Sequence, residues 1–121
     1  LVVFTDGADN ASMLSSKLAI ESARERGIPI YTIAEGEAIV HSQLVAELDH
    51  ISRSTGGTPF LVRRLSEIGS VFQKISQDLL HGYLVGFQPS PGDARAWRKI
   101  EVVLGGAKAL KVRARDGFYV E

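Results

Sequence analysis

Short, continuous runs of apolar residues recur along the first half of the chain, separated by turn-forming and polar segments. These runs lie near residues 1–5, 28–34 and 58–62. A strand that is covered on both faces, as in a parallel sheet, has such a run instead of an alternating pattern. The first run stops at Asp6-Gly7, where the backbone can turn. We therefore predict three parallel strands, ordered sequentially in one sheet.

Between and after these runs, apolar residues recur every three or four positions, as they do on one face of a helix. This spacing predicts helices near residues 12–26, 41–54 and 65–81, the first with Ser12 as its N-cap and Gly27 as its stop. We expect Phe72 and Ile75 to be fully buried beneath the sheet. They lie at the centre of the clearest apolar stripe in the chain, which consists of Leu65, Ile68, Phe72, Ile75 and Leu79.

Strands that alternate with helices predict an α/β fold, with a doubly wound, Rossmann-like parallel sheet and helices on both faces. The pattern changes at Gly82, after which three strand-like segments follow without a helix between them: Tyr83–Phe87, Arg98–Leu104 and Leu110–Arg115. Their Pro- and Gly-rich links predict an antiparallel β meander. We therefore divide the chain into an α/β part, residues 1–81, and a β extension packed on it, residues 82–121.

The composition limits the classes of partner. The chain has 121 residues, enough for one domain, and its 14 basic residues balance 14 acidic ones. Net charge therefore predicts no attraction to nucleic acid, and no apolar run reaches the ~20 residues that insertion into a membrane requires. No cysteine is present, which excludes disulfides and thiolate metal sites.

Asp6 is the residue that most suggests chemistry. Ligands of open α/β sheets gather at the carboxyl ends of the parallel strands, and Asp6 directly follows the first strand. A carboxylate there, with Gly7 letting the backbone turn, is suited to hold a hard cation directly or through water. For a lone aspartate at a strand end, capping of the turn is the more common role. Trp97 also has two open roles, packing the extension on the α/β part or anchoring a partner, and we expect packing.

Several stretches, in order, resemble von Willebrand factor A domains. LVVFTDGADNAS at residues 1–12 is similar to the fourth strand of that family and the loop after it. GIPIYTI at 27–33 resembles the fifth strand, and ISRSTGG at 51–57 the helix leading to the sixth. Residues 65–80 resemble the final helix. YLVGFQP at 83–89 and LKVRARDGFY at 110–119 resemble the extension of a bacterial subgroup, the "VWFA-related" proteins common in Acidobacteria.

This resemblance implies a non-catalytic adhesion module with a metal-ion-dependent adhesion site. In the family, the aspartate that matches Asp6 belongs to this site and commonly acts through a water. The cofactor would be Mg²⁺, or Mn²⁺ or Ca²⁺, and a carboxylate from a protein partner would complete the coordination shell. Asp9 and Ser12 are weaker candidate ligands, since their positions before a helix favour capping. The subgroup also suggests an extracytoplasmic bacterial protein.

One departure from the family pattern concerns the metal ligands. The family's site is built mainly from an Asp-x-Ser-x-Ser motif after the first strand, and this motif is absent from the 121 residues. Because the sequence opens inside a strand, we expect a C-terminal part of the domain whose N-terminal half is missing. Two alternatives stay open. One is a flavodoxin-like phosphotransfer or phosphatase-type enzyme that uses Asp6, although Phe4 stands where Asp-x-Asp-Gly needs an acid. The other is a purely structural part without a metal.

Overall fold

Three parallel strands form the main sheet of this computed structural model, which describes residues 1–7, 15–90, 96–106 and 112–119. The strand order is β1-β2-β3, and a separate antiparallel pair, β4–β5, follows. The elements, in chain order, are β1 (Val2–Thr5), α1 (Ser16–Glu25), β2 (Tyr31–Glu35), η1 (Gly36–Ile39), α2 (Ser42–Thr55), β3 (Pro59–Val62), η2 (Leu65–Glu67), α3 (Ile68–Leu80), β4 (Trp97–Lys99) and β5 (Gly117–Tyr119).

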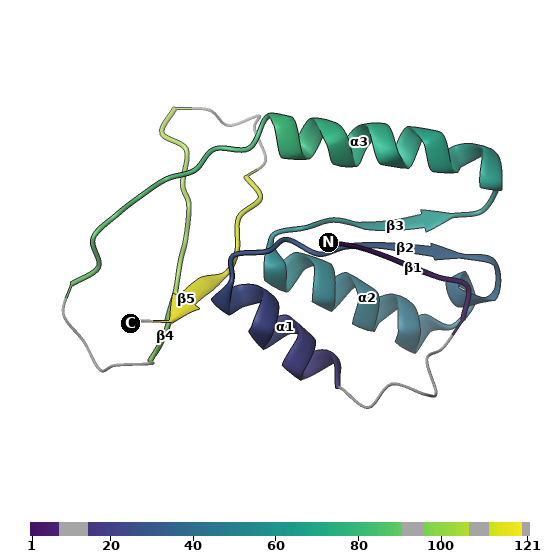
Figure 1. The fold of residues 1–121 in the computed structure, drawn as a ribbon, viewed down its shortest axis with the longest axis horizontal. Coiled ribbons are helices and arrows are strands. Elements are labelled where there is room, and N and C mark those ends of the chain that lie inside the picture. Colours follow the sequence, from purple (N-terminus) through teal and green to yellow (C-terminus); the bar gives the residue numbers. More distant parts are fainter. Residues whose placement is uncertain (8–14, 91–95, 107–111, 120–121) are drawn as a thin grey trace.

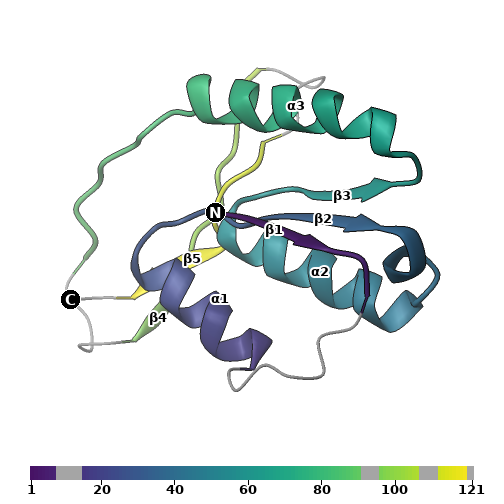
Figure 2. The ribbon, with the colours of Figure 1, turned by 45° about the vertical axis from the view of Figure 1, so that its right-hand side comes forward.

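The sheet lies between two helical layers. Helices α1 and α2 lie on one side of it and α3 on the other (Figure 1), an arrangement that is also seen after rotation (Figure 2). Side chains alternate between the two faces of a strand. Tyr31 and Ile33 of β2 accordingly contact α3, whereas Thr32 and Ala34 contact α2 and η1. The predicted α/β fold with sequentially ordered parallel strands is confirmed.

The core under α3 corrects one prediction and confirms another. Ile75 is buried, as predicted, and packs with Tyr31, Ile33 and Val62. Phe72, however, is 48% exposed, and Val71 occupies the buried position beside Ile75. Val71 and Ile75 lie one helical turn apart, and Phe72 is about 100° further round the helix than Val71. The helix face that contacts the sheet therefore consists of Ile68, Val71 and Ile75, and Phe72 lies beside this face.

The opposite face is held by hydroxyl groups of α2. The Thr32 and Ser52 hydroxyls lie 2.9 Å apart, and the Thr32 hydroxyl also donates to the Leu48 carbonyl at 3.2 Å. The backbone N–H groups of Ile30 and Thr32 donate to Thr55 Oγ1 and Ser52 Oγ. Buried polar groups are costly unless they are paired, so these bonds fix α2 against the start of β2.

Helix α1 starts later than predicted. Its N-cap is Ser15, whose Oγ accepts from the Leu18 N–H at 3.4 Å, and the helix begins at Ser16. Ser12, the predicted cap, lies outside the described residues. The predicted stop is confirmed, because Gly27 follows the helix with a φ of 64°, which glycine adopts without steric cost.

The predicted meander is wrong in most of its strands. Residues 83–87 form no strand, and Tyr83 is 96% exposed. Of Leu110–Arg115, the described residues 112–115 also form no strand. The observed antiparallel pair is shorter: β4 contains only the first two residues of the predicted strand Arg98–Leu104, and β5 follows the predicted Leu110–Arg115. Trp97 lies opposite Tyr119 and Lys99 opposite Gly117. Gly117 is required there, because a Cβ would lie 2.4 Å from the Arg98 carbonyl oxygen.

Residues 112–116, which we call the C-terminal strap, run along the amino end of the sheet and do not join it as a strand. Arg113 pairs with Asp78 of α3 at 2.5 Å and donates to the Thr58 hydroxyl just before β3. Asp116 pairs with Arg24 of α1, also at 2.5 Å. The strap thus joins helices from both faces of the sheet, through the ion pairs of Arg113 and Asp116 with the α/β part.

The outer edge of β1 is open among the described residues. β1 pairs with β2 through Val2–Thr5 and Tyr31–Ala34. Val2, Val3 and Phe4 are 38%, 38% and 49% exposed, although their sequence is typical of a buried strand. The register aligns Val2 and Phe4 with Tyr31 and Ile33, so they belong to the face that carries α3.

Candidate metal site at the carboxyl end of the sheet

Asp6 lies where the prediction put it, at the carboxyl end of β1. The three strands are parallel, so the residues that follow them meet at the same end of the sheet (Figure 1). The register aligns Thr5 with Ala34 and Ala34 with Leu61, which brings the ends of all three strands level. The Asp6 side chain is exposed at this end. Its position is that of ligand-binding residues in open α/β sheets.

The backbone around Asp6 is held by local hydrogen bonds. The Thr5 hydroxyl donates to the Gly7 carbonyl at 2.5 Å, and the Gly7 N–H donates back to Thr5 Oγ1 at 3.3 Å. The Ala38 N–H of η1 donates to the Asp6 carbonyl at 3.0 Å. These bonds use backbone and hydroxyl groups and leave the Asp6 carboxylate to solvent, so the carboxylate is available to a cation or its waters.

The remaining predicted ligands cannot be placed beside Asp6, since Asp9 and Ser12 lie outside the described residues. In the described ranges, no three acidic, histidine or cysteine side chains converge in a way that could hold a metal ion. Two more carboxylates belong to the same end of the sheet, Glu35 at the end of β2 and Glu37 in η1. Of the predicted ligands, the described residues therefore place Asp6 alone at this end of the sheet.

Basic residues follow the third strand and were not among the predicted site residues. Arg63 is exposed directly after β3. Arg64 next to it pairs with Glu67 at 2.9 Å, and this hydrogen bond lowers the pKa of the Glu67 carboxyl below its ordinary value. A shallow hollow of about 380 Å³ lies between Arg63 and the loop after β2, lined by Gly36, Ile39, Val40 and Arg63. In the sequence, Arg63 could have been found as a candidate site residue by its position directly after the third strand.

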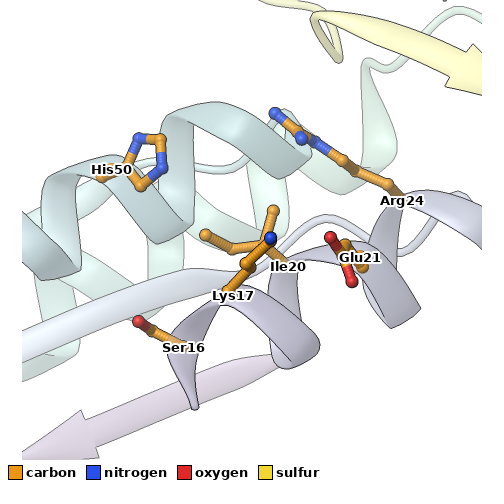
Figure 3. A pocket seen from close by; sticks show the side chains of 6 residues that line it. All are labelled: Ser16, Lys17, Ile20, Glu21, Arg24 and His50. Carbon is orange, nitrogen blue, oxygen red and sulfur yellow. The ribbon is translucent and has the colours of Figure 1, made fainter. Parts of the chain in front are cut away.

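A second hollow, of about 330 Å³, lies between α1 and α2 (Figure 3). It is lined by Ser16, Lys17, Ile20, Glu21, Arg24 and His50. Arg24 is committed to neighbours, since its Nε donates to the Ser54 carbonyl at 3.2 Å and its guanidinium lies 4.5 Å from the Trp97 ring centre. His50 Nδ1 lies 3.3 Å from Ser54 Oγ. Arg24 and His50 thus form contacts within the fold. Glu21 is the single acid among the lining residues, so the hollow contains no pair of carboxylates that could bind a metal ion.

Trp97 packs the extension on the α/β part, as we expected. Besides its contact with Arg24, its ring lies 4.8 Å from that of Tyr119, edge to face. Arg24 therefore connects α1, the end of α2, the strap and β4 at one point.

The chain matches no protein-family model and no curated protein. It is similar to a crystal structure described as an uncharacterized membrane spanning protein from Vibrio fischeri, with 24% sequence identity and a TM-score of 0.56. The match covers 68% of this chain and 46% of that one, so the chain spans about half the length of the structure it resembles. At this identity the likeness shows the fold alone. None of the helices described here is both long and apolar enough to cross a membrane.

Proposed function

We propose that the chain is the C-terminal part of a doubly wound von Willebrand factor A domain, and that it binds a protein partner through a metal ion without catalysing a reaction. The observation that carries the proposal is the exposed Asp6 carboxylate at the carboxyl end of β1, in a parallel sheet of sequential order. The order and spacing of the family-like stretches support it. An extracytoplasmic bacterial location belongs to the same proposal.

The open edge of β1 supports the placement of the other ligands. An apolar edge strand with unpaired backbone groups is a template for another strand, and proteins cover such edges. Val2, Val3 and Phe4 are exposed at this edge. The proposal places a further strand, and with it the Asp-x-Ser-x-Ser ligands, on polypeptide that precedes Leu1 and pairs with β1.

The proposed chemistry follows from the preferences of Mg²⁺. This ion is octahedral, gives up its waters reluctantly, and binds proteins through one or two carboxylates. Asp6 would orient one water of the shell, and hydroxyls from the upstream motif would bind the ion directly. Because few direct ligands are charged, the ion stays electrophilic and attracts a carboxylate from the partner. Mn²⁺ or Ca²⁺ would be held by the same oxygen ligands.

Calorimetric titration with Mn²⁺ and Mg²⁺ tests the proposal, using the polypeptide that includes the upstream motif. We expect Asp6→Ala to weaken metal binding about tenfold or more, as loss of an outer-shell ligand does. Glu47→Ala, an exposed acid on α2, is the matched control and should bind as the unmodified protein does. Equal affinities of the two variants would contradict the proposal.

Residues 1–121 alone provide a second test. One carboxylate and waters cannot offset dehydration of Mg²⁺, so we expect binding that is millimolar or weaker. Saturable binding at micromolar Mg²⁺ would mean that this chain contains further ligands, and Asp9 and Ser12 would be the first to substitute.

A further inference from the structure

The segment after α3 carries large apolar side chains that are almost fully exposed. Tyr83, Leu84 and Val85 are 96%, 102% and 75% exposed, and Leu80 before them is 80% exposed. The ribbon of this segment runs along the outside of the molecule in both views (Figure 1 and Figure 2). Soluble proteins rarely expose adjoining apolar side chains of this size, and such a patch often marks a binding surface. We call residues 82–88 the apolar arm.

Both ends of the apolar arm are attached to the fold. Before it, the N–H of His81 closes the last turn of α3 with a bond of 3.0 Å. At its far end, the Phe87 ring lies 5.2 Å from that of Phe118 in β5, edge to face. Arg98 of β4 donates to the Ser90 carbonyl at 2.7 Å, just beyond the arm. Attachment at both ends lowers the conformational entropy that would be lost if the middle of the arm became ordered.

The apolar arm has the sequence of a strand and belongs to no sheet in the described part of the chain. Tyr, Val and Phe favour extended strands. Pro89 has no N–H to donate, so it limits the segment that can pair. No Asp, Glu, Lys or Arg occurs from Leu79 to Ser90, whereas charges are what usually keep other strands away from an unpaired one. The arm is therefore suited to pair with another strand.

The sequence of the arm is complementary to itself in one antiparallel register, which is centred on Val85. Tyr83 then lies opposite Phe87 of a second copy, Leu84 lies opposite Gly86, and Val85 lies opposite Val85. Aromatic pairs stabilise antiparallel strands. The space beside Gly86 is open, since nothing lies within 4 Å of a Cβ placed there, and it can receive a leucine side chain.

The same register gives the ribbon one continuous apolar face. Side chains alternate along a strand, so Tyr83, Val85 and Phe87 of both copies lie on the same side. A register shifted by one residue would instead set each aromatic ring opposite a glycine. The complementarity of the arm to itself therefore favours a second copy of this chain as its partner.

We infer that the apolar arm is a dimerisation element, in which the arms of two copies pair as antiparallel strands about a twofold axis at Val85. Twofold dimers, with the same surface on both subunits, are the commonest assemblies of identical chains. A specific interface buries at least about 1,000 Å² in total, and a covered aromatic side chain contributes about 150–250 Å². Tyr83 and Phe87 of the two copies can therefore supply a large part of this area.

The dimer is expected to be weak. A two-stranded ribbon is only marginally stable in water, so we expect a dissociation constant between about 10 µM and 1 mM. The inference does not depend on a metal ion at Asp6. Metal titration of Asp6→Ala and the measurements of association below can therefore fail independently of each other.

Disulfide formation tests the register, because the chain contains no cysteine of its own. Opposite residues of an antiparallel pair have Cα atoms about 4.5–5.5 Å apart, within the range of a disulfide. We expect Val85→Cys to form a covalent dimer in air at about 100 µM protein, within the expected range of dissociation constants. Tyr83→Cys is the matched control, because its two copies would lie about 14 Å apart along the ribbon.

A second control separates pairing from random collision. Val103 is 78% exposed, close to the 75% of Val85, and lies outside the arm, so Val103→Cys should form far less covalent dimer. Equal yields for the three cysteine variants, or no covalent dimer of Val85→Cys, would overturn the inference.

Sedimentation velocity of the 121-residue chain from about 10 µM to 1 mM measures the association itself. We expect Val85→Asp to weaken dimerisation about tenfold or more, because two carboxylates would lie opposite each other and the apolar contact would be lost. Val103→Asp should dimerise as the unmodified chain does. Both side chains are exposed, so urea denaturation should show that both variants are as stable as the unmodified chain. A chain that stays monomeric up to about 1 mM would overturn the inference. So would association that Val85→Asp leaves unchanged, which would place the interface elsewhere, for example at the open edge of β1.

Discussion

The two ends of the parallel sheet are built in opposite ways. At the amino end, segments far apart in the sequence meet: Arg24 of α1 binds the Ser54 carbonyl, Asp116 and the Trp97 ring. Arg113 joins α3 to the start of β3. At the carboxyl end, the described residues come from loops that follow the strands, and Asp6, Glu37 and Arg63 are exposed there.

Because of this difference, we expect the amino end of the sheet to determine stability and the carboxyl end to determine binding. Contacts between distant segments at the amino end hold both helical layers against the sheet. The carboxyl end can then present exposed side chains on loops of fixed backbone, where substitution changes recognition with little effect on folding. The comparison predicts that variants at the amino end lower the free energy of unfolding and that variants at the carboxyl end do not.

The largest effect is expected at Gly57. A Cβ at this position would lie 1.9 Å from the Ile30 carbonyl oxygen, so the turn before β3 and the start of β2 would have to separate. We expect Gly57→Ala to lower the free energy of unfolding by more than about 3 kcal/mol, measured by urea denaturation. Gly69→Ala is the control, because nothing lies within 4 Å of the added atom and α3 should gain up to about 1 kcal/mol. A loss of similar size in both variants would contradict the close approach as its cause.

Arg24→Ala should have the next largest effect. It removes the bond to the Ser54 carbonyl, the contact with Trp97 and the partner of Asp116, whose Oδ1 is already buried without a hydrogen bond. Because Asp116 is partly exposed, solvent screens part of the loss, and we expect about 1–3 kcal/mol. The emission of Trp97, the single tryptophan, should change as well.

Arg26→Ala tests whether this effect is specific. Arg26 is exposed and caps α1 through its backbone, so we expect a change below about 0.5 kcal/mol. If both variants lost the same stability and the Trp97 emission stayed constant, the amino end would not be held by Arg24.

Most of the α/β part could be predicted from the sequence. The three apolar runs became parallel strands in the predicted order, and the helices near 41–54 and 65–81 were found at 42–55 and 68–80. These elements could be predicted because a strand or helix that is covered by a neighbouring layer needs apolar residues on the covered face, and this need gives the apolar runs and the helical spacing. The exposure of Phe72 could not be predicted from the sequence. The spacing of Ile68, Val71 and Ile75 is also helical, and periodicity alone does not specify which of the two sets of residues meets the sheet.

The extension was predicted poorly for a different reason. Tyr83–Phe87 has the composition of a strand, but a strand also needs a partner edge, and that pairing depends on the whole fold. Arg113 of the strap pairs with Asp78 of α3, a contact between distant segments that the local sequence pattern does not indicate. At the candidate site, Asp6 followed from its strand-end position. The hollow beside Arg63 depends on the conformation of η1, which no motif in the sequence indicates.

A smaller, pH-dependent effect is expected at Tyr31, on the buried face under α3. Burial raises the pKa of its phenol above the ordinary value, the Asp78 carboxylate raises it further, and Arg113 opposes them. Unfolded tyrosine ionises near pH 10, whereas the folded protein resists ionisation. This contribution to stability is therefore complete below about pH 10 and is lost as the pH rises through the folded pKa. Tyr31→Phe should make the loss of stability above about pH 10 less steep.

Urea denaturation from neutral pH to about pH 11 measures this slope. The difference in unfolding free energy between the protein and Tyr31→Phe should be constant near neutral pH and shrink in the alkaline range. A constant difference throughout would show that Tyr31 ionises equally easily in both states.

The smallest effect is expected at the carboxyl end. Asp6→Ala and Arg63→Gln should each change the free energy of unfolding by less than about 0.5 kcal/mol, because both side chains are exposed. The bond that fixes the Asp6 loop runs from the Ala38 N–H to the Asp6 carbonyl and survives both substitutions. Urea denaturation under the conditions of the binding experiments measures this. A loss above about 1 kcal/mol for Asp6→Ala would mean that the carboxylate caps its turn, the structural role that a strand-end aspartate can also have. If the loss stays below that limit, weaker metal binding by Asp6→Ala can be attributed to the site and not to a damaged fold.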